Sequence, residues 1–308
     1  MRNFLIVFLS FSFQLHALVI NHIQGNPTFF SNITSQEIIN AKKTLHIGYE
    51  HTSHGSQLTY SMTHLVDFMN NGGLYMNMSS NLYAWNNGGS GDALDLDDGG
   101  VAPGSRDAGI YPDWYISTTN YLQTPANSNC NVIIWAWCGQ VPDKYTNNTI
   151  VSEYLAPMAS LETNYPDVTF VYMTGHADHS RHSDLTAGNQ LIRDFCVNSN
   201  RVLYDFYDIE TYDPDGNFYE FPNDNCDYYR DAGNYVLGNW GLHYETTHVE
   251  GVEWYYMDPP PAHTRSINGN MKAYAAWALW VSIAAVPEPS LLLFFLLFLL
   301  IINKRSSL

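Results

Sequence analysis

The segment Glu50–Gly55, which reads Glu-His-Thr-Ser-His-Gly, contains the residue types that nucleophilic catalysis needs. Ser53 lies just ahead of Ser56–Met69, whose apolar residues recur with helical spacing. The first backbone N–H groups of a helix have no partner within it, so a serine here lies where a developing oxyanion can be stabilised. Ser53 is therefore a candidate nucleophile. A serine that only caps the helix is the alternative interpretation.

A second chemically rich segment is Thr174–His182, which contains His176, Asp178, His179 and His182. Imidazole is the commonest side-chain ligand of transition metals, so one interpretation is a metal-dependent hydrolase centred on the three histidines. The other is a set of polar groups that line a pocket. His176, which is nearest to the preceding apolar run, is expected to face that pocket.

Alternating apolar runs and helical patterns predict the elements that must position these residues. Strands are predicted over residues 44–49, 131–137, 168–173 and 201–206, and helices over residues 56–69, 151–164, 185–198 and 268–284. Residues 71–111 and 208–261 are predicted to be long and irregular. The alternation indicates an α/β fold with a parallel sheet, in which ligands bind beyond the carboxyl ends of the strands. Residues 50–55, 138–141, 174–182 and 207–210 follow those ends.

Three features in fixed order resemble a divergent SGNH (GDSL-like) hydrolase. They are the His51–Gly55 turn after a strand, the Trp137–Gln140 block after the next, and His263 followed by Asn268-Gly269 and an Ala-rich helix. The resemblance spans residues 44–284. It implies a three-layer, flavodoxin-like fold with helices on both faces of the sheet and long loops at the carboxyl ends of its strands. It also implies hydrolysis of esters, including acyl groups on polysaccharides, with no cofactor.

The resemblance assigns roles by position. Ser53 matches the nucleophile, His263 the general base, and Asp258 is the nearest carboxylate that could orient this base. Gln140 stands where the family has an asparagine, and it would donate a hydrogen bond to the oxyanion beside the backbone N–H of Ser53. The residues expected to contact substrate are His51, Gly89, Gly139 and His176. The oxyanion-hole glycine of the family's second block could equally be Gly88, Gly89 or Gly91.

The segment Asp213-Pro214-Asp215-Gly216-Asn217 has alternating oxygen-bearing side chains, as calcium-binding loops do. The three candidate calcium ligands are Asp213, Asp215 and Asn217. A complete EF-hand loop would need glutamate at its twelfth position, which is Asp224 here. The alternative, which the composition favours, is an ordinary Asp/Gly turn.

Both ends of the chain are predicted to be sorting segments around a single body, residues 18–285. Residues 1–17 have a basic start, an apolar stretch and a small residue at the end, as a signal peptide does. A buried first strand or helix is the alternative. Residues 286–308 contain Pro287-Glu288-Pro289, an apolar run and a basic tail, and so resemble a PEP-CTERM sorting signal. That resemblance implies transient anchoring in the inner membrane, cleavage by an exosortase-type enzyme, and export to the periplasm, cell surface or medium.

Thirteen Lys and Arg stand against thirty Asp and Glu, which gives a formal net charge of −17. Nucleic acid is excluded as a partner because phosphate neutralisation needs clustered basic residues. The expected partner is instead a carbohydrate or acyl-ester substrate. Export would permit disulfides among the four cysteines, but their spacing does not fix a pairing. A non-catalytic carbohydrate-binding or matrix protein with the same fold is the second functional interpretation.

Overall fold

The computed structural model describes residues 17–104 and 106–285. Nearly all of the predicted signal peptide and the whole of the predicted sorting signal lie outside these ranges. Among the described residues, no helix has the length and apolar character that a membrane span requires. All four cysteines lie within the described ranges, and each is a free thiol.

A seven-stranded sheet, parallel throughout, forms the centre of the molecule. Its spatial order is β1-β7-β6-β5-β2-β4-β3. The strands are β1 (Leu18–Ile20), β2 (His46–Glu50), β3 (Trp85–Asn86), β4 (Leu94–Asp98), β5 (Val132–Trp135), β6 (Thr169–Met173) and β7 (Val202–Tyr204). Without the short edge strands β1 and β3, the order β4-β2-β5-β6-β7 is the flavodoxin-like one. The predicted fold class is confirmed.

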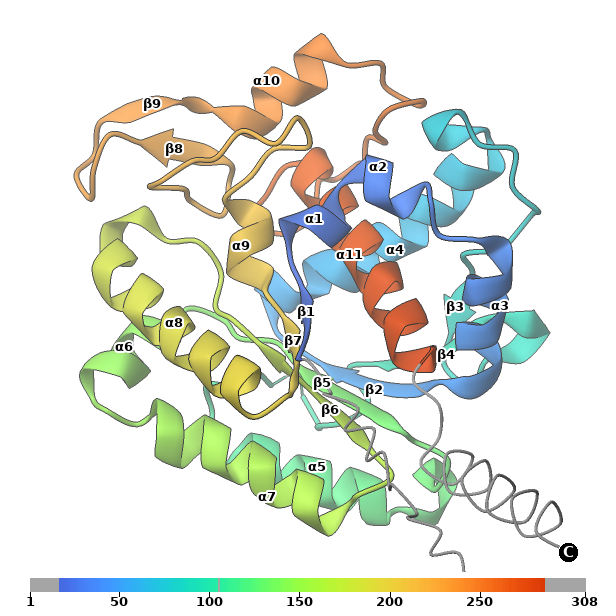
Figure 1. Ribbon diagram of the computed structural model, residues 1–308, viewed down its shortest axis with the longest axis vertical. Helices are drawn as coiled ribbons and strands as arrows, with labels where there is room; N and C mark the ends of the chain where they lie inside the picture. Colours follow the sequence, from blue (N-terminus) through green and yellow to red (C-terminus); the bar gives the residue numbers. More distant parts are fainter. Residues whose placement is uncertain (1–16, 105, 286–308) are drawn as a thin grey trace, which may run out of the picture.

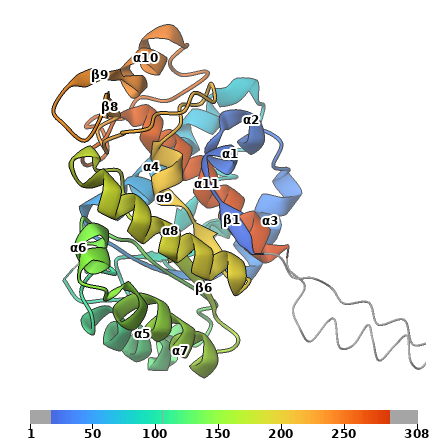
Figure 2. The same cartoon turned by 60° about the vertical axis from the view of Figure 1, so that its left-hand side comes forward.

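Helices cover both faces of the sheet and make three layers (Figures 1 and 2). One face carries α5 (Asp113–Gln123), α6 (Val141–Thr146), α7 (Ala156–Asn164) and α8 (His182–Asn198). The other carries α1 (His22–Gly25), α2 (Pro27–Phe30), α3 (Ser35–Thr44), α4 (Ser53–Asn70), α9 (Phe206–Glu210) and α11 (Ser266–Ala284). After β2 the chain passes through α4 to β3 and β4 on one side of β2. It then returns to form β5, β6 and β7 on the other side, so the strand order reverses between β2 and β5. Ligands of this fold class bind beyond the carboxyl ends of the strands at such a reversal of strand order, which here lies between β2 and β5.

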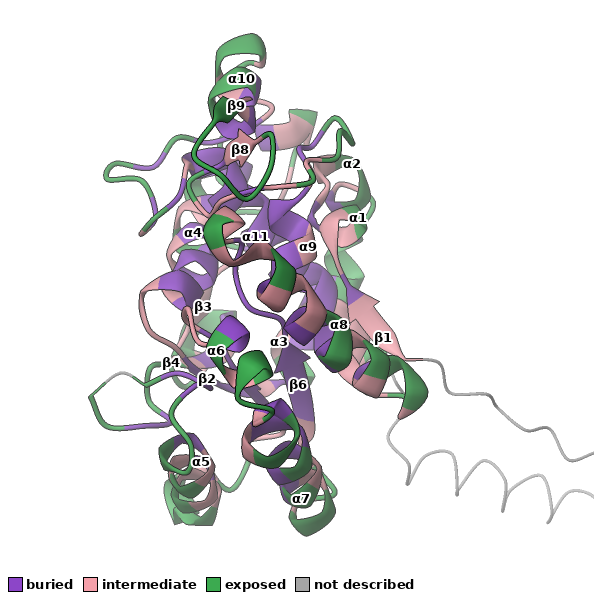
Figure 3. Ribbon diagram, turned by 90° about the vertical axis from the view of Figure 1, so that its left-hand side faces the viewer, coloured by how far each residue is buried: buried purple, intermediate pink, exposed green. Residues whose placement is uncertain are grey.

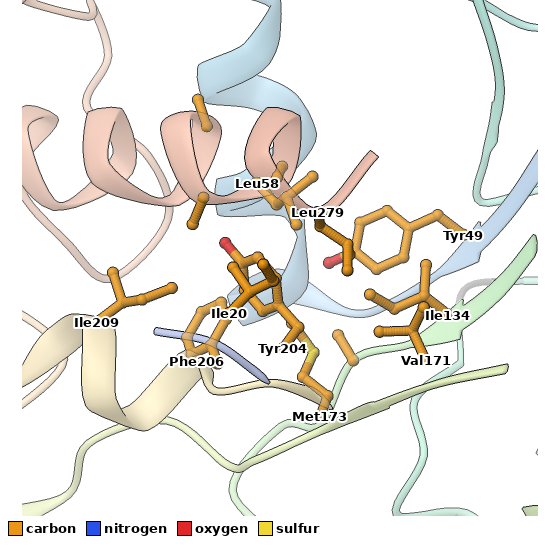
Figure 4. Close-up of a cluster of buried hydrophobic side chains, with 14 of the residues drawn as sticks. Ile20, Tyr49, Leu58, Ile134, Val171, Met173, Tyr204, Phe206, Ile209 and Leu279 are labelled. Carbon is orange, nitrogen blue, oxygen red and sulfur yellow. The ribbon is translucent and has the colours of Figure 1, made fainter. Parts of the chain in front are cut away.

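The helix α11 is buried along nearly its whole length, from Ser266 to Trp280 (Figure 3). It packs against α4, α3 and α1 and contacts β1. Its residues from Ala273 to Trp280 are apolar on every side, and such a segment can lie inside a domain without leaving a face to water. Below it, a cluster that includes Leu279, Leu58 and Tyr49 fills the space above the sheet (Figure 4). This core fixes α4 and α11, the two helices next to which the candidate residues lie.

The four predicted strands and four predicted helices all exist, and the differences concern what lies between them. The region 71–111 was predicted to be irregular, but it contains β3 and β4. In β4 the leucines Leu94 and Leu96 are buried, and they alternate with aspartates. Four aspartates between residues 92 and 98 masked the period-two pattern of a half-buried strand. The region 208–261 likewise folds into an antiparallel hairpin, β8 (Asp227–Tyr229) and β9 (Val236–Asn239), and α10 (Trp240–Thr247).

Candidate active site

Ser53 is the first residue of α4, and its Oγ lies 3.0 Å from Nε2 of His263. The predicted nucleophile and the predicted base are therefore in hydrogen-bond contact. The helix can start this close to the sheet because residue 55 is glycine. A Cβ at Gly55 would lie 2.4 Å from Cβ of His51 and 2.5 Å from Cβ of Ala136. The hydroxyl of Tyr49 donates to the Gly55 carbonyl and fixes the same turn.

His263 lies in a loop whose backbone is held from several sides. The side chain of Gln57, on α4, donates to the carbonyl of Ala262 at 2.6 Å. Thr264 accepts a hydrogen bond from Asn268 in the first turn of α11. His263 itself has a left-handed φ of 65°, a conformation that non-glycine residues adopt mainly where the surroundings enforce it. These contacts make the position of the imidazole a property of the fold.

The structure does not support the role given to Asp258. Among the described residues, no hydrogen bond or ion pair connects Asp258 to His263. The carboxylate near this histidine is Asp224, from the loop before β8. Candidate ligand atoms of Asp224, His54 and His263 all lie within 4.8 Å of one another. Asp224 is far from His263 in sequence and follows no strand of the main sheet, so no local pattern indicated it.

Three imidazole rings stack in a column at the base of the site. The ring of His54 lies 3.7 Å from that of His176 and 4.4 Å from that of His263, centroid to centroid, with interplanar angles of 4° and 11°. Burial opposes protonation of His54, but hydrogen bonds to Asp224 and Cys138 outweigh it and raise the pKa of His54 to about 9. Burial and the neighbouring His54 lower the pKa of His176. Of these two stacked rings, His54 is therefore the one that binds a proton more readily.

Cys138 follows β5 and lies on the opposite side of His54 from Asp224. Its Sγ is 3.2 Å from Nδ1 of His54, and Nε2 of the same ring is 3.1 Å from Oδ2 of Asp224. The hydrogen bond to His54 lowers the pKa of the Cys138 thiol, against the opposing effect of burial. The sequence block Trp137–Gln140 pointed to this loop, but not to its thiol.

Gln140 lies at the same carboxyl edge of the sheet, and both its amide nitrogen and its amide oxygen make hydrogen bonds. Its Nε2 donates to Asp107 at 3.1 Å, and its Oε1 accepts from the backbone N–H of Cys138. Asp107 also accepts from the hydroxyl of Thr52, so this one carboxylate links the loop after β5 to the residue before Ser53. An amide nitrogen carries two N–H groups, which leaves Gln140 one for an oxyanion. Asp107 lies in the region predicted to be irregular, and sequence reasoning missed it.

Three of the four residues expected to contact substrate lie at this edge of the sheet. His51 is the first residue after β2, and its Nε2 lies 2.7 Å from Oδ1 of Asp98. Burial opposes protonation of His51, and the hydrogen bond to Asp98 outweighs it, so the pKa of His51 is raised. A Cβ at Gly139 would lie 3.7 Å from Nε2 of His176, so these two residues are neighbours. A surface hollow beside His263 is lined by Asn225, Asn239 and residues 260–265.

Gly89 does not belong to this site. It precedes β4, whereas Ser53 follows β2, and the two strands are parallel neighbours. Gly89 therefore lies at the opposite end of the sheet, where it lines a cavity with Ser35 and Lys42. Gly88 and Gly91 precede β4 as well. The glycines at the carboxyl end of β4 are Gly99 and Gly100, and the N–H of Gly99 donates to the carbonyl of Tyr49.

The three histidines of the 174–182 segment do not converge on one point. His179 stacks on Tyr229 and His182 packs against Phe221, while only His176 joins the column. The group within the described ranges that could hold a metal is instead His54, Asp224 and His263. The lone pairs of imidazole nitrogens lie in the ring plane. Two nearly parallel stacked rings cannot both direct a lone pair at one ion without rotating.

The proposed calcium loop has the geometry of a turn. The carboxylate of Asp213 accepts hydrogen bonds from the backbone N–H of Asn217 and from the hydroxyl of Tyr219. Gly216 has a φ of 86°, as the turn requires. Asp215 lies 3.4 Å from His248 rather than turning toward Asp213. These contacts describe a turn that the Asp213 carboxylate closes.

A fully buried ion pair supports the site from below. Lys272 on α11 and Glu210 on α9 are both completely inaccessible, and Nζ lies 2.6 Å from Oε1. The other oxygen of Glu210 accepts from the N–H of Ala177, next to His176. Lys272 also donates to Gln57, which holds the backbone before His263. One pair of charges thus connects the loops that carry two of the stacked histidines, a relationship that no sequence spacing revealed.

Comparison with known proteins adds no identification, because no family model, curated protein or solved structure matches this chain.

Proposed function

We propose that this protein is a hydrolase that cleaves carboxylic esters with Ser53 as nucleophile and His263 as general base. The observation that carries the proposal is the 3.0 Å contact between Ser53 Oγ and His263 Nε2. Such contact between a hydroxyl and an imidazole is what activation of a serine nucleophile requires. It occurs at a helix N-terminus, at the carboxyl edge of a parallel sheet, where active sites of this fold class lie.

The mechanism follows from these positions. His263 takes the proton of Ser53 as Oγ attacks the carbonyl carbon of the ester. The negative charge that forms on the carbonyl oxygen is stabilised by free N–H groups in the first turn of α4, with Gln140 as a further donor. His263 then gives the proton to the leaving alcohol. Water, deprotonated by His263, releases the acid from the acyl-enzyme in the reverse sequence.

Asp224, rather than Asp258, is in this proposal the carboxylate that orients the general base His263. Its carboxylate lies close to both His54 and His263 and offsets the positive charge that forms on His263 during catalysis. Burial opposes ionisation of Asp224, but its hydrogen bond to His54 and the nearby histidines keep its pKa below the usual value. The group is therefore negatively charged at neutral pH.

The substrate class that we propose is an acyl ester on a neutral or acylated polysaccharide. The body, residues 18–285, has ten basic and twenty-nine acidic residues, so polyanionic substrates would be repelled. We also propose that residues 1–17 and 286–308 direct export, which would bring the enzyme to extracellular glycans. A non-catalytic glycan-binding protein is the competing proposal.

The decisive experiment combines fluorophosphonate labelling with hydrolysis of p-nitrophenyl acetate. Wild type should be labelled at Ser53, and Ser53→Ala should lose the label and the turnover that depends on Ser53. Ser56→Ala is the matched control, because Ser56 lies in the same turn and its Oγ only donates to the Ser53 carbonyl. Labelling that survives in Ser53→Ala would overturn the assignment. Glycan retention without any labelling would favour the non-catalytic alternative.

A further inference from the structure

Cys138 and Ser53 occupy equivalent places on neighbouring strands. Glu50 of β2 pairs with Trp135 of β5 in the sheet, and each nucleophilic residue stands three positions beyond its strand's paired residue. Each also has its own imidazole, since Ser53 contacts His263 and Cys138 contacts His54. The mechanism derived for Ser53 uses neither the thiol nor the proton on His54.

We propose that Cys138, His54 and Asp224 form a second nucleophilic triad, in which Cys138 accepts acyl groups as a thioester. The nucleophile, base and orienting carboxylate follow one another through hydrogen bonds of 3.2 and 3.1 Å, on the two nitrogens of one ring. This arrangement is what nucleophilic catalysis by cysteine requires. The inference does not depend on Ser53 being active.

The surroundings of Cys138 differ from those of the other three thiols. Burial raises the pKa of Cys130 to about 11 and those of Cys196 and Cys226 to about 12. Cys138 is the one among them with an imidazole within hydrogen-bond distance, and it is partly exposed. A thiolate forms readily beside a protonated imidazole and is the reactive form of cysteine. The structure therefore separates one reactive thiol from three inert ones.

The acyl transfer balances without a further reagent. The Cys138 thiolate attacks the carbonyl carbon of an ester, and an S–C bond forms as the C–O bond to the alcohol breaks. The leaving alkoxide takes the proton from Nδ1 of His54. Water then attacks the thioester with neutral His54 as base, the acid is released, and the thiolate and imidazolium are restored. Asp224 holds the ring through Nε2 in both steps.

The first test measures alkylation by iodoacetamide, followed at each cysteine by peptide mass spectrometry of the whole protein. At pH 6.5 we expect Cys138 to react at least about tenfold faster than Cys130, because the hydrogen bond to His54 lowers the pKa of Cys138 whereas burial raises that of Cys130. Cys130 is the matched control, since it is also partly exposed and lacks a histidine partner. Equal rates at the two thiols would overturn the proposal, and this comparison needs no variant.

The second test removes the imidazole. His54→Asn should lower the alkylation rate of Cys138 to that of Cys130, whereas His64→Asn, on an outer turn of the same helix, should not change it. The other ionisable groups that face the pair are Asp224, His176, His263 and Glu210. Asp224→Asn should therefore shift the pH profile of alkylation upward. An unchanged rate in His54→Asn would contradict the triad.

The third test looks for the thioester itself. Ser53→Ala, incubated with p-nitrophenyl acetate and quenched in acid, should carry an acetyl group on Cys138 that neutral hydroxylamine removes. Ser53→Ala/Cys138→Ala should carry none. Absence of the adduct in Ser53→Ala would refute acyl transfer to the thiol. The serine proposal is tested separately by fluorophosphonate labelling of Cys138→Ala. It fails if Ser53 is not labelled in that variant.

Discussion

Ser53 and His263 are 210 residues apart in the chain, yet their side chains meet at 3.0 Å. The contact joins the first residue of α4 to the loop that leads into α11, and these two helices pack against each other. The position of one helix relative to the other thus sets the distance between nucleophile and base. Catalysis should respond both to the two residues and to whatever fixes this pair of helices.

Replacement of His263 by Ala should lower kcat for p-nitrophenyl acetate by about 100-fold or more, because general base catalysis contributes about 10²–10⁴-fold. His64→Ala, on the outer side of α4, should leave kcat within about twofold of wild type. Steady-state kinetics at several pH values would check both. Full activity of His263→Ala would show that another group activates Ser53.

Replacement of Gly55 by Ala should destabilise the protein by about 1–3 kcal/mol, since the new methyl group meets Cβ atoms of His51 and Ala136 that cannot swing away. The same strain should displace Ser53 and reduce turnover. Urea unfolding measures the first effect and ester hydrolysis the second. Thr63→Ala, an exposed site on α4, provides the baseline. A Gly55→Ala protein as stable as that control would mean that the turn tolerates a side chain.

Replacement of Lys272 by Met should cost about 3–5 kcal/mol of unfolding free energy, because it leaves the carboxylate of Glu210 buried without its partner. Lys272→Met/Glu210→Gln should recover part of this loss. Arg230→Met, which removes an exposed pair with Asp231, should change stability by less than about 0.5 kcal/mol. Denaturant titrations of the three variants give the comparison, and equal losses in Lys272→Met and Arg230→Met would argue against a structural role for the buried pair.

The protonated state of His54 predicts how stability depends on pH. Its pKa is raised from 6.5 to about 9 in the folded protein, so the stabilisation is complete below pH 6.5 and is lost as the pH rises toward 9. The lowered pKa of Cys138 acts in the opposite direction and reduces the net change. The free energy of unfolding of wild type should therefore fall between pH 6.5 and 9. A fall of the same size in His54→Asn would assign the effect to other groups.

Chelation should leave the serine chemistry intact. The rings of His54 and His263 are nearly parallel, an arrangement that does not suit joint coordination of one ion. We expect fluorophosphonate labelling and ester hydrolysis to be unchanged after dialysis against EDTA, and elemental analysis to find less than one metal ion per chain. Loss of activity on chelation and its recovery with added Zn²⁺ would instead favour a metal-dependent hydrolase built on His54, Asp224 and His263.

The strands and helices could be predicted from the sequence where a segment has one clear pattern of apolar residues. The strand at 132–135 and the helix at 266–284 are apolar enough that no other reading competes. The acidic strand β4 was not predicted, because its aspartates pair with groups from other elements, such as His46 on β2. The spacing of apolar residues within a short segment does not show which distant residues will pair with its polar side chains.

The candidate site was predictable to the extent that strand ends determine it. Ser53, Gln140 and His176 follow three adjacent strands and had to meet at one edge of the sheet. His263 was found through the resemblance in motif order. Asp224 and Asp107 come from irregular segments, and their positions depend on tertiary contacts such as the hydrogen bond from the Asp224 N–H to the Ala177 carbonyl.

The path of α11 has a consequence for how the protein would work at a surface. This helix begins beside His263, runs antiparallel to the strands and ends at Ala284, at the edge where β1 also starts (Figure 2). A helix of 19 residues is about 28 Å long, so it spans the whole layer. A tether attached after Ala285 would therefore leave the domain on the side away from Ser53. If residues 286–308 anchor the protein as proposed, the contact between Ser53 and His263 would face away from the anchor.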